Sequence, residues 1–301
     1  MNILVTGGAG FIGKHLVKNL VELGHNITVA DFNDPCIDTV HYFKINLASD
    51  DWDIINGNFD VIYHLAAQPY GRGSEEEPYI DLKYNTEAFL KMCYFAKLKK
   101  VKKVIYTSSM AVYGNNTYAN ETDILQPLSN YAVSKLYGEF CLKKFAADGS
   151  FVYSILRLWN TYGIGQDLTN KNKGIVSSLA QQVCNSNLIN VTGALDRYRD
   201  LIHVNDVVNS LLLCLDNITN NETFNVCSSM LMTVDSIIKN LIIANNKLFD
   251  DYSIKNIGTH DGDQHGCVGN NDKLRSIGWN VTVPIEEGFA EFINYIKTNN
   301  E

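Results

Sequence analysis

The chain has 301 residues, 46% of them hydrophobic, and a formal net charge of −8 at pH 7. A chain of this size can bury a substantial core in one large domain or two unequal ones. The acidic balance argues against nucleic-acid or membrane-surface partners, although local arginines and helix N-termini can still bind an anionic ligand. Because no apolar run approaches the ~18 residues of a membrane span and Met1 precedes the first predicted strand, we expect no membrane anchor and no signal peptide.

Short apolar segments alternate with stretches of helical periodicity through the first half of the chain. This alternation is typical of an α/β fold with a doubly wound parallel sheet of the Rossmann type. Beyond residue 160 the rhythm breaks. We therefore expect residues 1–160 to form a dinucleotide-binding domain and 161–301 a smaller α/β substrate domain, with segments near 200–226 returning to the first. The predicted strands are 2–6, 26–30, 40–45, 60–65, 103–108 and 152–157, and the helices are 11–23, 79–99 and 131–146.

The first strand leads into a glycine turn, since residues 4–13 read LVTGGAGFIG. Glycines permit a tight turn that a pyrophosphate can approach closely, and the following helix N-terminus offers N–H groups to the anion. A glycine-rich turn alone has an ordinary structural reading as well. The candidate residues here are Gly7, Gly10, Phe11, Ile12 and Gly13.

The second predicted strand ends in Asp31, about 20 residues after the turn, where a carboxylate can accept hydrogen bonds from an adenosine ribose. This context favours the dinucleotide reading of the glycine turn. No Lys or Arg lies between Asp31 and Phe43, so nothing nearby neutralises a 2′-phosphate. The sequence therefore predicts NAD in preference to NADP.

A candidate reaction centre follows in Ser109, Tyr131 and Lys135. Tyr131 and Lys135 are four residues apart, so on a helix they share one face. A neighbouring ammonium and a positive nicotinamide ring both favour the phenolate of Tyr131, which can then act as a base. Ser109 follows the strand at 103–108, where its hydroxyl can hydrogen-bond the substrate oxygen that loses the proton. The Tyr-x-x-x-Lys spacing occurs often by chance, and its combination with Ser109 and the glycine turn carries the prediction.

With these motifs the chain resembles the extended short-chain dehydrogenase/reductase family, the NAD-dependent epimerases and dehydratases of nucleotide sugars. The resemblance runs nearly end to end through GGAGFIG, DVIYHLAAQ (60–68), TSSMAVYG (107–114), YAVSK (131–135) and RDLIHVNDVV (199–208). It implies that Asp31 and Asn46 hold the adenosine and that Lys135 also binds the nicotinamide ribose. It further places along the cofactor path Leu47, Leu65, Ala66, Ala67 and Asn85.

Within this family the two residues after the serine discriminate reactions. The 4,6-dehydratases carry Asp-Glu there, and sugar-acid decarboxylases keep a Glu at the second position. Met110 and Ala111 of this chain cannot exchange protons. The resemblance therefore implies a 4-epimerase acting through a transient 4-keto sugar, and the preference for NAD leans the same way. A 4-reductase or 4-dehydrogenase is the alternative, and a catalytically silent NAD(H)-binding sensor is disfavoured by the intact Ser109, Tyr131 and Lys135.

The substrate end is also interpreted from the resemblance. Arg199 matches the family's phosphate-binding arginine, and Asn160 matches the asparagine that hydrogen-bonds the diphosphate sugar. His260 stands where a second phosphate arginine is common, and Arg197 could compensate. Cys267 stands where a small residue leaves room for a 2-acetamido group, with a buried structural cysteine as the alternative. We expect a UDP-hexose or a UDP-N-acetylhexosamine.

The seven cysteines contain no Cys-x-x-Cys pair, and the histidines lack metal-ligand spacing. We therefore expect no metal, no disulfide framework and a cytoplasmic protein. His203 is interpreted as completing local hydrogen bonds and not as a catalyst. The helices at 79–99 and 131–146 resemble those that pair across the family's dimer axis, with inward packing on the sheet as the alternative. The apolar face predicted for a homodimer consists of Phe89, Leu90, Cys93, Ala96, Leu136 and Phe140.

Overall fold

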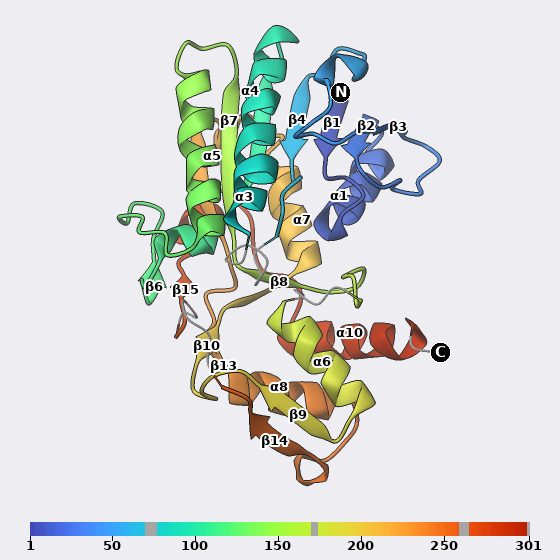
Figure 1. Ribbon diagram of the computed structural model, residues 1–301, viewed down its shortest axis with the longest axis vertical. Coiled ribbons are helices and arrows are strands. Elements are labelled where there is room, and N and C mark those ends of the chain that lie inside the picture. Colours follow the sequence, from blue (N-terminus) through green and yellow to red (C-terminus); the bar gives the residue numbers. More distant parts are fainter. Residues whose placement is uncertain (70–76, 170–173, 259–264, 300–301) are drawn as a thin grey trace.

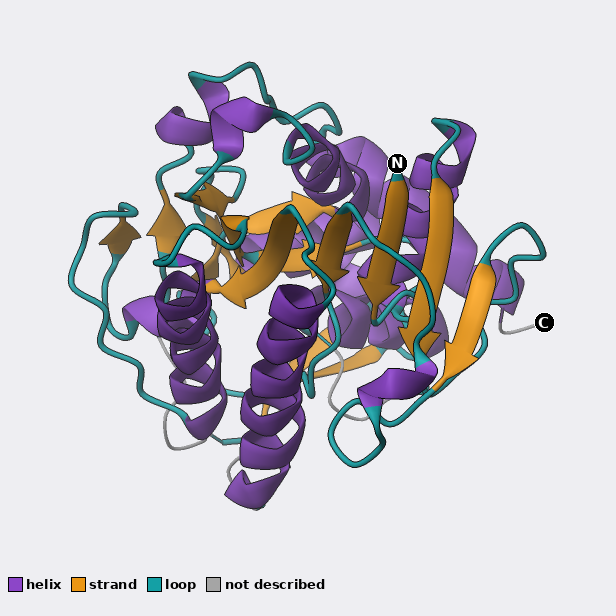
Figure 2. Ribbon diagram, turned by 90° about the horizontal axis from the view of Figure 1, so that it is seen from above, coloured by secondary structure: helices purple, strands orange, loops and turns teal. Residues whose placement is uncertain are grey.

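The computed structural model describes residues 1–69, 77–169, 174–258 and 265–299. A seven-stranded parallel sheet occupies the upper part of Figure 1, in the order β12-β7-β5-β4-β1-β2-β3. Strand order reverses between β1 and β4, and helices cover both faces (Figure 2), which confirms the predicted doubly wound α/β fold. The strands are β1 (Asn2–Thr6), β2 (Asn26–Asp31), β3 (His41–Lys44), β4 (Val61–His64), β5 (Lys103–Ser109), β7 (Val152–Leu158) and β12 (Glu222–Val226).

The central strands β4 and β5 are buried along nearly their whole length because the sheet is covered on both sides. All residues of β4 are buried, as is β5 up to its last residue. Two covered faces remove the alternation of polar and apolar residues that a half-exposed strand would show. One face packs against α1 (Phe11–Glu22) and α7 (Val204–Leu213), which contact each other.

The other face is covered by α4 (Ala88–Leu98) and α5 (Asn130–Ala146). The helix predicted at 79–99 is divided, because α4 is preceded by α3 (Pro78–Asp81) and by a π-helical turn, η2 (Leu82–Glu87). The predicted dimer face is partly wrong, since three of its four α4 residues belong to the stripe that packs on the sheet, whereas Leu90 is only partly buried. The side chains concerned, all without exposed surface, are Phe89, Cys93 and Ala96.

A separate cluster of buried residues lies in the lower part of Figure 1. It forms between three amphipathic helices and a pair of parallel strands, β9 (Leu188–Val191) and β14 (Ser253–Asn256). The chain passes back into the large sheet through α7 and β12 between these segments. The three helices are α6 (Ile175–Asn185), α8 (Val234–Ala244) and α10 (Ile285–Asn299).

Two short strand pairs link loops near the large sheet to segments from the second half of the chain. β8 (Asn160–Tyr162) pairs with β11 (Leu201–His203), and β6 (Tyr118–Ala119) pairs with β15 (Val268–Gly269). These pairs bring residues from the second half of the chain next to the carboxyl ends of β5 and β7. The remaining elements are η1 (Trp52–Ile54), η3 (Met110–Tyr113), β10 (Tyr198–Arg199), η4 (Asn217–Thr219), β13 (Met232–Thr233), η5 (Phe249–Asp251) and α9 (Asp272–Arg275).

Candidate active site

The turn between β1 and α1 is packed so tightly that it excludes side chains. Gly7 has a φ of 76°, and a Cβ there would lie 2.5 Å from the backbone nitrogen of Ala66. A Cβ on Gly13 would collide with the carbonyl oxygen of Gly7. Gly10 caps α1 without a side-chain hydrogen bond, so the first N–H groups of the helix are available to an anion in the adjoining cleft. Those groups belong to Phe11, Ile12 and Gly13.

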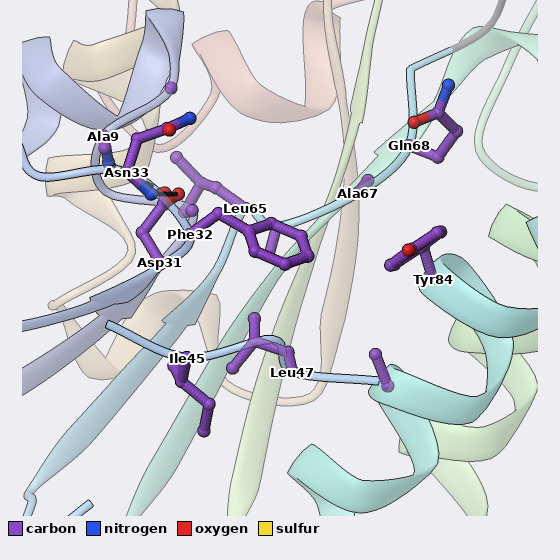
Figure 3. A pocket seen from close by; sticks show the side chains of 14 residues that line it. Ala9, Asp31, Phe32, Asn33, Ile45, Leu47, Leu65, Ala67, Gln68 and Tyr84 are labelled. Atoms are coloured by element: carbon purple, nitrogen blue, oxygen red, sulfur yellow. Dashed lines mark hydrogen bonds between the residues drawn. The ribbon is translucent and has the colours of Figure 1, made fainter. Parts of the chain in front are cut away.

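A cavity of about 440 Å³ lies beside this turn, at the carboxyl ends of β1, β2 and β4 (Figure 3). Asp31 lines it, and its carboxylate accepts hydrogen bonds from the N–H groups of Ala9 at 3.0 Å and Asn33 at 3.1 Å. A carboxylate has about four acceptor positions, so Asp31 keeps capacity for ribose hydroxyls. Phe32 and Tyr84 also line the cavity, with ring centroids 6.1 Å apart. The Asp31 carboxylate can accept from the ribose hydroxyls, and the rings of Phe32 and Tyr84 line the same cavity, which suits an adenosine.

The segment after β3 forms another wall of the cavity. Ile45 and Leu47 line it, whereas Asn46 is not among the lining residues. The Asn46 Oδ1 accepts hydrogen bonds from the N–H groups of Ala48 at 3.0 Å and Ser49 at 3.3 Å. Asn46 therefore stabilises the turn after this wall, and its adenine contact stays a prediction.

Leu65, Ala66 and Ala67 follow β4 and line the same cavity. The next residue, Gln68, is held by Asn85, whose Oδ1 accepts from the Gln68 N–H at 2.7 Å and whose Nδ2 donates to the Gln68 carbonyl at 3.2 Å. Asn85 is buried and is absent from the described lining of the cavity. Asn85 therefore fixes the backbone of Gln68, a residue of the cavity lining, without lining the cavity itself.

The cavity continues into a second, larger part of the cleft, of about 690 Å³, where Ser109, Tyr131 and Lys135 come together. Ser109 ends β5 and hydrogen-bonds the Tyr131 hydroxyl, which projects from the first turn of α5. The Lys135 Nζ donates to the Thr107 carbonyl at 3.0 Å and lies 5.8 Å from the centroid of the Tyr131 ring. The three residues predicted from separate motifs thus share one wall of the cleft.

The electrostatics of this group differ in one respect from expectation. Burial raises the pKa of Tyr131 to about 12, while the hydrogen bond with Ser109 lowers it and the charge of Asp81 raises it. Burial lowers the pKa of Lys135 to about 8, against the raising effect of Asp81. Without a cofactor, Tyr131 is therefore a protonated phenol at neutral pH. The positive nicotinamide ring of bound NAD is one source of charge that would favour its phenolate form.

The residues predicted for the substrate lie in different environments. Asn160 begins β8 and lines the cleft, with its Nδ2 donating to the Asp200 carbonyl at 3.1 Å. The Arg199 Nη1 donates to the carbonyls of Tyr198 at 2.7 Å and His265 at 3.2 Å, and Arg199 is absent from the described lining. His260 lies outside the described residues.

Cys267 is 1% exposed and belongs to the hydrophobic core, with its carbonyl accepting from the Trp159 Nε1 at 3.3 Å. Trp159 lines the cleft, and Cys267 is absent from the described lining. Arg197 donates to the carbonyls of Thr192 and Ala194 and is likewise absent from it. The structure thus favours the structural reading of Cys267.

His203 takes part in local hydrogen bonding, as predicted. Its Nδ1 accepts from the Asn205 N–H at 3.3 Å at the start of α7. Across the described ranges, no group of three His, Cys, Asp or Glu side chains is arranged to hold a metal ion. In the same part of the chain, no helix combines the length and apolar character needed to cross a bilayer.

Sequence reasoning missed three residues near the cleft: Phe32, Tyr84 and Asp81. Asp81 is 2% exposed and acts electrostatically on both Tyr131 and Lys135. A signal for its burial was present, because Asp81 shares a helical stripe with the core residues that follow it. That stripe consists of Asp81, Asn85, Ala88, Phe89, Met92 and Ala96, all buried.

Comparison with known proteins agrees with this geometry. The sequence pattern of the NAD dependent epimerase/dehydratase family matches residues 3–227. The chain belongs to this family. It is 26% identical to the UDP-glucose 4-epimerase of Mycolicibacterium smegmatis, with 100% of both chains covered, and 26% identical to an Escherichia coli dTDP-4-dehydro-6-deoxyglucose reductase, covering 98% of this chain and 97% of the relative. The crystal structure of Thermotoga maritima UDP-glucose 4-epimerase with UDP-glucose superposes with a TM-score of 0.92 at 28% identity, and 100% of both chains is covered.

Family membership confirms the resemblance to extended short-chain dehydrogenases/reductases. It also confirms that the chain has the architecture of an NAD-dependent enzyme. The roles of individual residues stay predictions.

Proposed function

We propose that this protein is an NAD-dependent nucleotide-sugar 4-epimerase that acts through a transient 4-keto sugar. The observation that carries the proposal is the meeting of Ser109, Tyr131 and Lys135 in one cleft beside the glycine turn. Met110 and Ala111, which follow Ser109, have no side chain that exchanges protons, which disfavours elimination of water. Oxidation and reduction at C4 are the chemistry left to this site.

The cleft fits NAD in its shape and its donor set. Gly7 and Gly13 permit the tight turn, because a Cβ at either position would collide with backbone atoms. The start of α1 offers N–H groups to the pyrophosphate, and Asp31 offers carboxylate oxygens to the ribose. No Lys or Arg occurs among the described residues that line the adenosine cavity, which disfavours a 2′-phosphate. Bound NAD supplies a hydride acceptor and donor for C4 of the sugar. The residues proposed to hold it are Gly7, Gly10, Phe11, Ile12, Gly13, Asp31, Asn46, Leu47, Leu65, Ala66, Ala67, Asn85, Tyr131 and Lys135.

In the proposed mechanism, the Tyr131 Oη removes the proton from the C4 hydroxyl as the sugar is oxidised and gives it back when the 4-keto sugar is reduced. Ser109 hydrogen-bonds the same sugar oxygen and so fixes it within reach of Tyr131. The Lys135 ammonium, held by the Thr107 carbonyl, stabilises negative charge on the phenolate. Inversion then requires the 4-keto sugar to present its opposite face before the hydride returns.

The alternative is a nucleotide-sugar 4-reductase or 4-dehydrogenase, and the similarity to an E. coli reductase at 26% identity is the observation that favours it. The two reactions use the same residues and differ in the fate of the cofactor. An epimerase retains NAD through each turnover, whereas a reductase consumes one NADH per product. A silent NAD(H)-binding sensor is less favoured, because Ser109, Tyr131 and Lys135 are all present.

For the substrate we propose a UDP-hexose or a UDP-N-acetylhexosamine, supported by the similarity to an epimerase crystallised with UDP-glucose. Asn160, which lines the cleft, is proposed to contact the diphosphate sugar. Arg199 and His260 are proposed for the phosphates on family resemblance alone. The burial of Cys267 gives no support to the acetamido reading.

The test is to purify the protein, quantify co-purified NAD by mass spectrometry, and incubate the holoprotein with UDP-glucose and with UDP-N-acetylglucosamine. The expected product is the C4 epimer, formed without net change in NADH absorbance. Product formation that requires stoichiometric NADH would identify the reductase. Bound NAD without turnover of any nucleotide sugar would favour the sensor.

We further propose a homodimer formed through α4 and α5, as in the family resemblance. Tyr94, Leu98, Val133 and Phe140 are respectively 57%, 77%, 53% and 63% exposed on these two helices. These exposed apolar side chains lie on two helices that pack against each other, and exposed apolar surface of this kind is typical of an interaction surface. We call these four residues the α4/α5 surface.

A cytoplasmic location is proposed from the cysteines. All seven are free, including the four buried ones. Such usage fits a reducing compartment. Fractionation of cells that express a tagged protein tests it.

A further inference from the structure

Asp81, the last residue of α3, is a buried carboxylate beside the helix that carries Tyr131 and Lys135. The proposed mechanism does not use it. Taking a carboxylate out of water is costly unless it is hydrogen-bonded or faces an opposite charge. Both conditions hold for Asp81.

The hydrogen bonds connect Asp81 to the first turn of α5. The two hydrogens of the Asn85 Nδ2 are shared among the Asp81 Oδ1 at 3.0 Å, the Ser134 Oγ at 3.0 Å and the Gln68 carbonyl at 3.2 Å. The Ser134 hydroxyl in turn donates to the carbonyl of Tyr131 at 2.7 Å. Ser134 directly precedes Lys135, so this chain of bonds reaches the backbone between the two reactive residues.

Charge connects Asp81 to the same two residues. Its carboxylate raises the pKa of Lys135 against the lowering effect of burial. The same charge raises the pKa of Tyr131, in addition to the larger effect of burial. Asp81 therefore helps to keep Lys135 protonated and at the same time opposes ionisation of Tyr131.

Other titratable groups face the pair from β4, β5 and α5. Burial and the charge of Lys135 lower the pKa of His64 to about 3, so this histidine is neutral near pH 7. Burial raises the pKa of Tyr106, whose ring centroid lies 5.2 Å from the Lys135 Nζ. Glu139 is paired with Arg157 at 2.8 Å. Among the described residues, Asp81 is thus the anion that acts on both Tyr131 and Lys135.

We propose that Asp81 is a positioning residue that holds the first turn of α5 through Asn85 and Ser134 and places a carboxylate charge beside the helix that carries Tyr131 and Lys135. Its catalytic consequence rests on the proposed function, because Tyr131 must lose a proton while Lys135 keeps one. Neutralising Asp81 should lower the pKa of both residues. The whole bell-shaped profile of kcat/KM should then move to lower pH, which a purely structural defect would not cause.

The experiment compares the pH profiles of the wild-type holoenzyme, Asp81→Asn and Glu87→Gln. Glu87 is the matched control because it is an exposed carboxylate in the same helical stretch, paired with Lys91. We expect both limbs of the Asp81→Asn profile to move down by about one pH unit and the Glu87→Gln limbs to stay in place. Asp81→Ser, which also removes the charge, serves if the asparagine variant does not fold.

A second readout does not depend on turnover. In cofactor-free protein with ring-labelled tyrosine, the Tyr131 phenol should begin to deprotonate at lower pH when Asp81 is neutral. The NMR signal of Tyr131, assigned from Tyr131→Phe, reports this ionisation. If no nucleotide sugar reacts, the proposed function fails and this titration still decides the role of Asp81. If the limbs of the kcat/KM profile and the Tyr131 titration both stay in place in Asp81→Asn, and only kcat falls, the proposal is overturned.

Discussion

Glu139 and Arg157 form a two-pronged ion pair in the interior. Glu139 lies on α5, four residues after Lys135, and Arg157 lies on β7. The Arg157 Nε donates to the Glu139 Oε1 at 2.9 Å, and its Nη2 donates to the Oε2 at 2.8 Å. Both side chains are at most 3% exposed. The Ser108 hydroxyl donates to the same Oε1 at 2.6 Å, so the pair joins α5 and β7 to the strand that ends in Ser109.

Removing one member of this pair should be strongly destabilising. Glu139→Gln leaves the Arg157 guanidinium buried without its counter-charge, and the expected cost is about 3–5 kcal/mol of the free energy of unfolding. Denaturant unfolding at pH 7 measures it. Asp235→Asn is the control, because Asp235 pairs with Lys239 on the exposed surface of α8 and should cost no more than about 1 kcal/mol. Equal small losses in both variants would contradict the interpretation.

Tyr131→Phe should lower turnover by about 10² to 10⁴ while substrate affinity stays near wild type, since the variant loses the proton acceptor and keeps the ring. Steady-state kinetics with the best nucleotide sugar measure this. Tyr295→Phe on α10 is the control, because Tyr295 does not line the described cleft. A Tyr131→Phe variant with most of its activity would remove Tyr131 from the mechanism.

The sheet and the cofactor end of the site were predictable because their signals are local. A glycine turn between an apolar strand and an amphipathic helix has few alternatives, and Asp31 follows it at a set distance along the chain. The end of β5 and the start of α5 were also predictable from the sequence pattern. Ser109 and Tyr131 could therefore be placed at one edge of the sheet before their contact was known.

The errors concern which side of a helix faces the core. Phe89, Cys93 and Ala96 are apolar at helical spacing, and that pattern alone does not distinguish a core stripe from an interface. Asp81 was missed because an acidic residue is normally assigned to solvent, and only its neighbours on the same stripe reveal its burial. The burial of Cys267 depends on the pairing of β15 with β6, which joins segments distant in sequence.

Asp31→Ala should weaken NAD binding by roughly 10-fold or more, because hydrogen bonds to a charged group contribute about 1.5–3 kcal/mol. The variant should also narrow the preference of the wild type for NAD over NADP, since a nearby carboxylate repels a 2′-phosphate. Titration of both cofactors into apoprotein gives the two dissociation constants. Asp34→Ala removes an exposed carboxylate from the same loop and should leave the ratio unchanged. Equal affinity of the wild type for both cofactors would refute the role given to Asp31.

Phe140→Glu should convert the proposed dimer to a monomer, because a charge buried within an apolar contact is desolvated without a partner. Light scattering at micromolar concentration measures the mass. Ile124→Glu is the control, since Ile124 is 80% exposed and lies outside the α4/α5 surface. A wild type with the mass of a monomer would remove the dimer itself.

Cys267→Tyr separates the two readings of that residue. Cys267 packs in the core behind Trp159, so a tyrosine there has no space and should cost about 1–3 kcal/mol of stability through overpacking. A defect of this kind acts on the whole wall of the cleft. Activity on UDP-glucose and on UDP-N-acetylglucosamine should therefore fall by the same factor, alongside a lower melting temperature. If instead the loss is roughly 10- to 100-fold larger for the N-acetylated sugar and stability is unchanged, Cys267 borders the sugar and the pocket selects by size at this position.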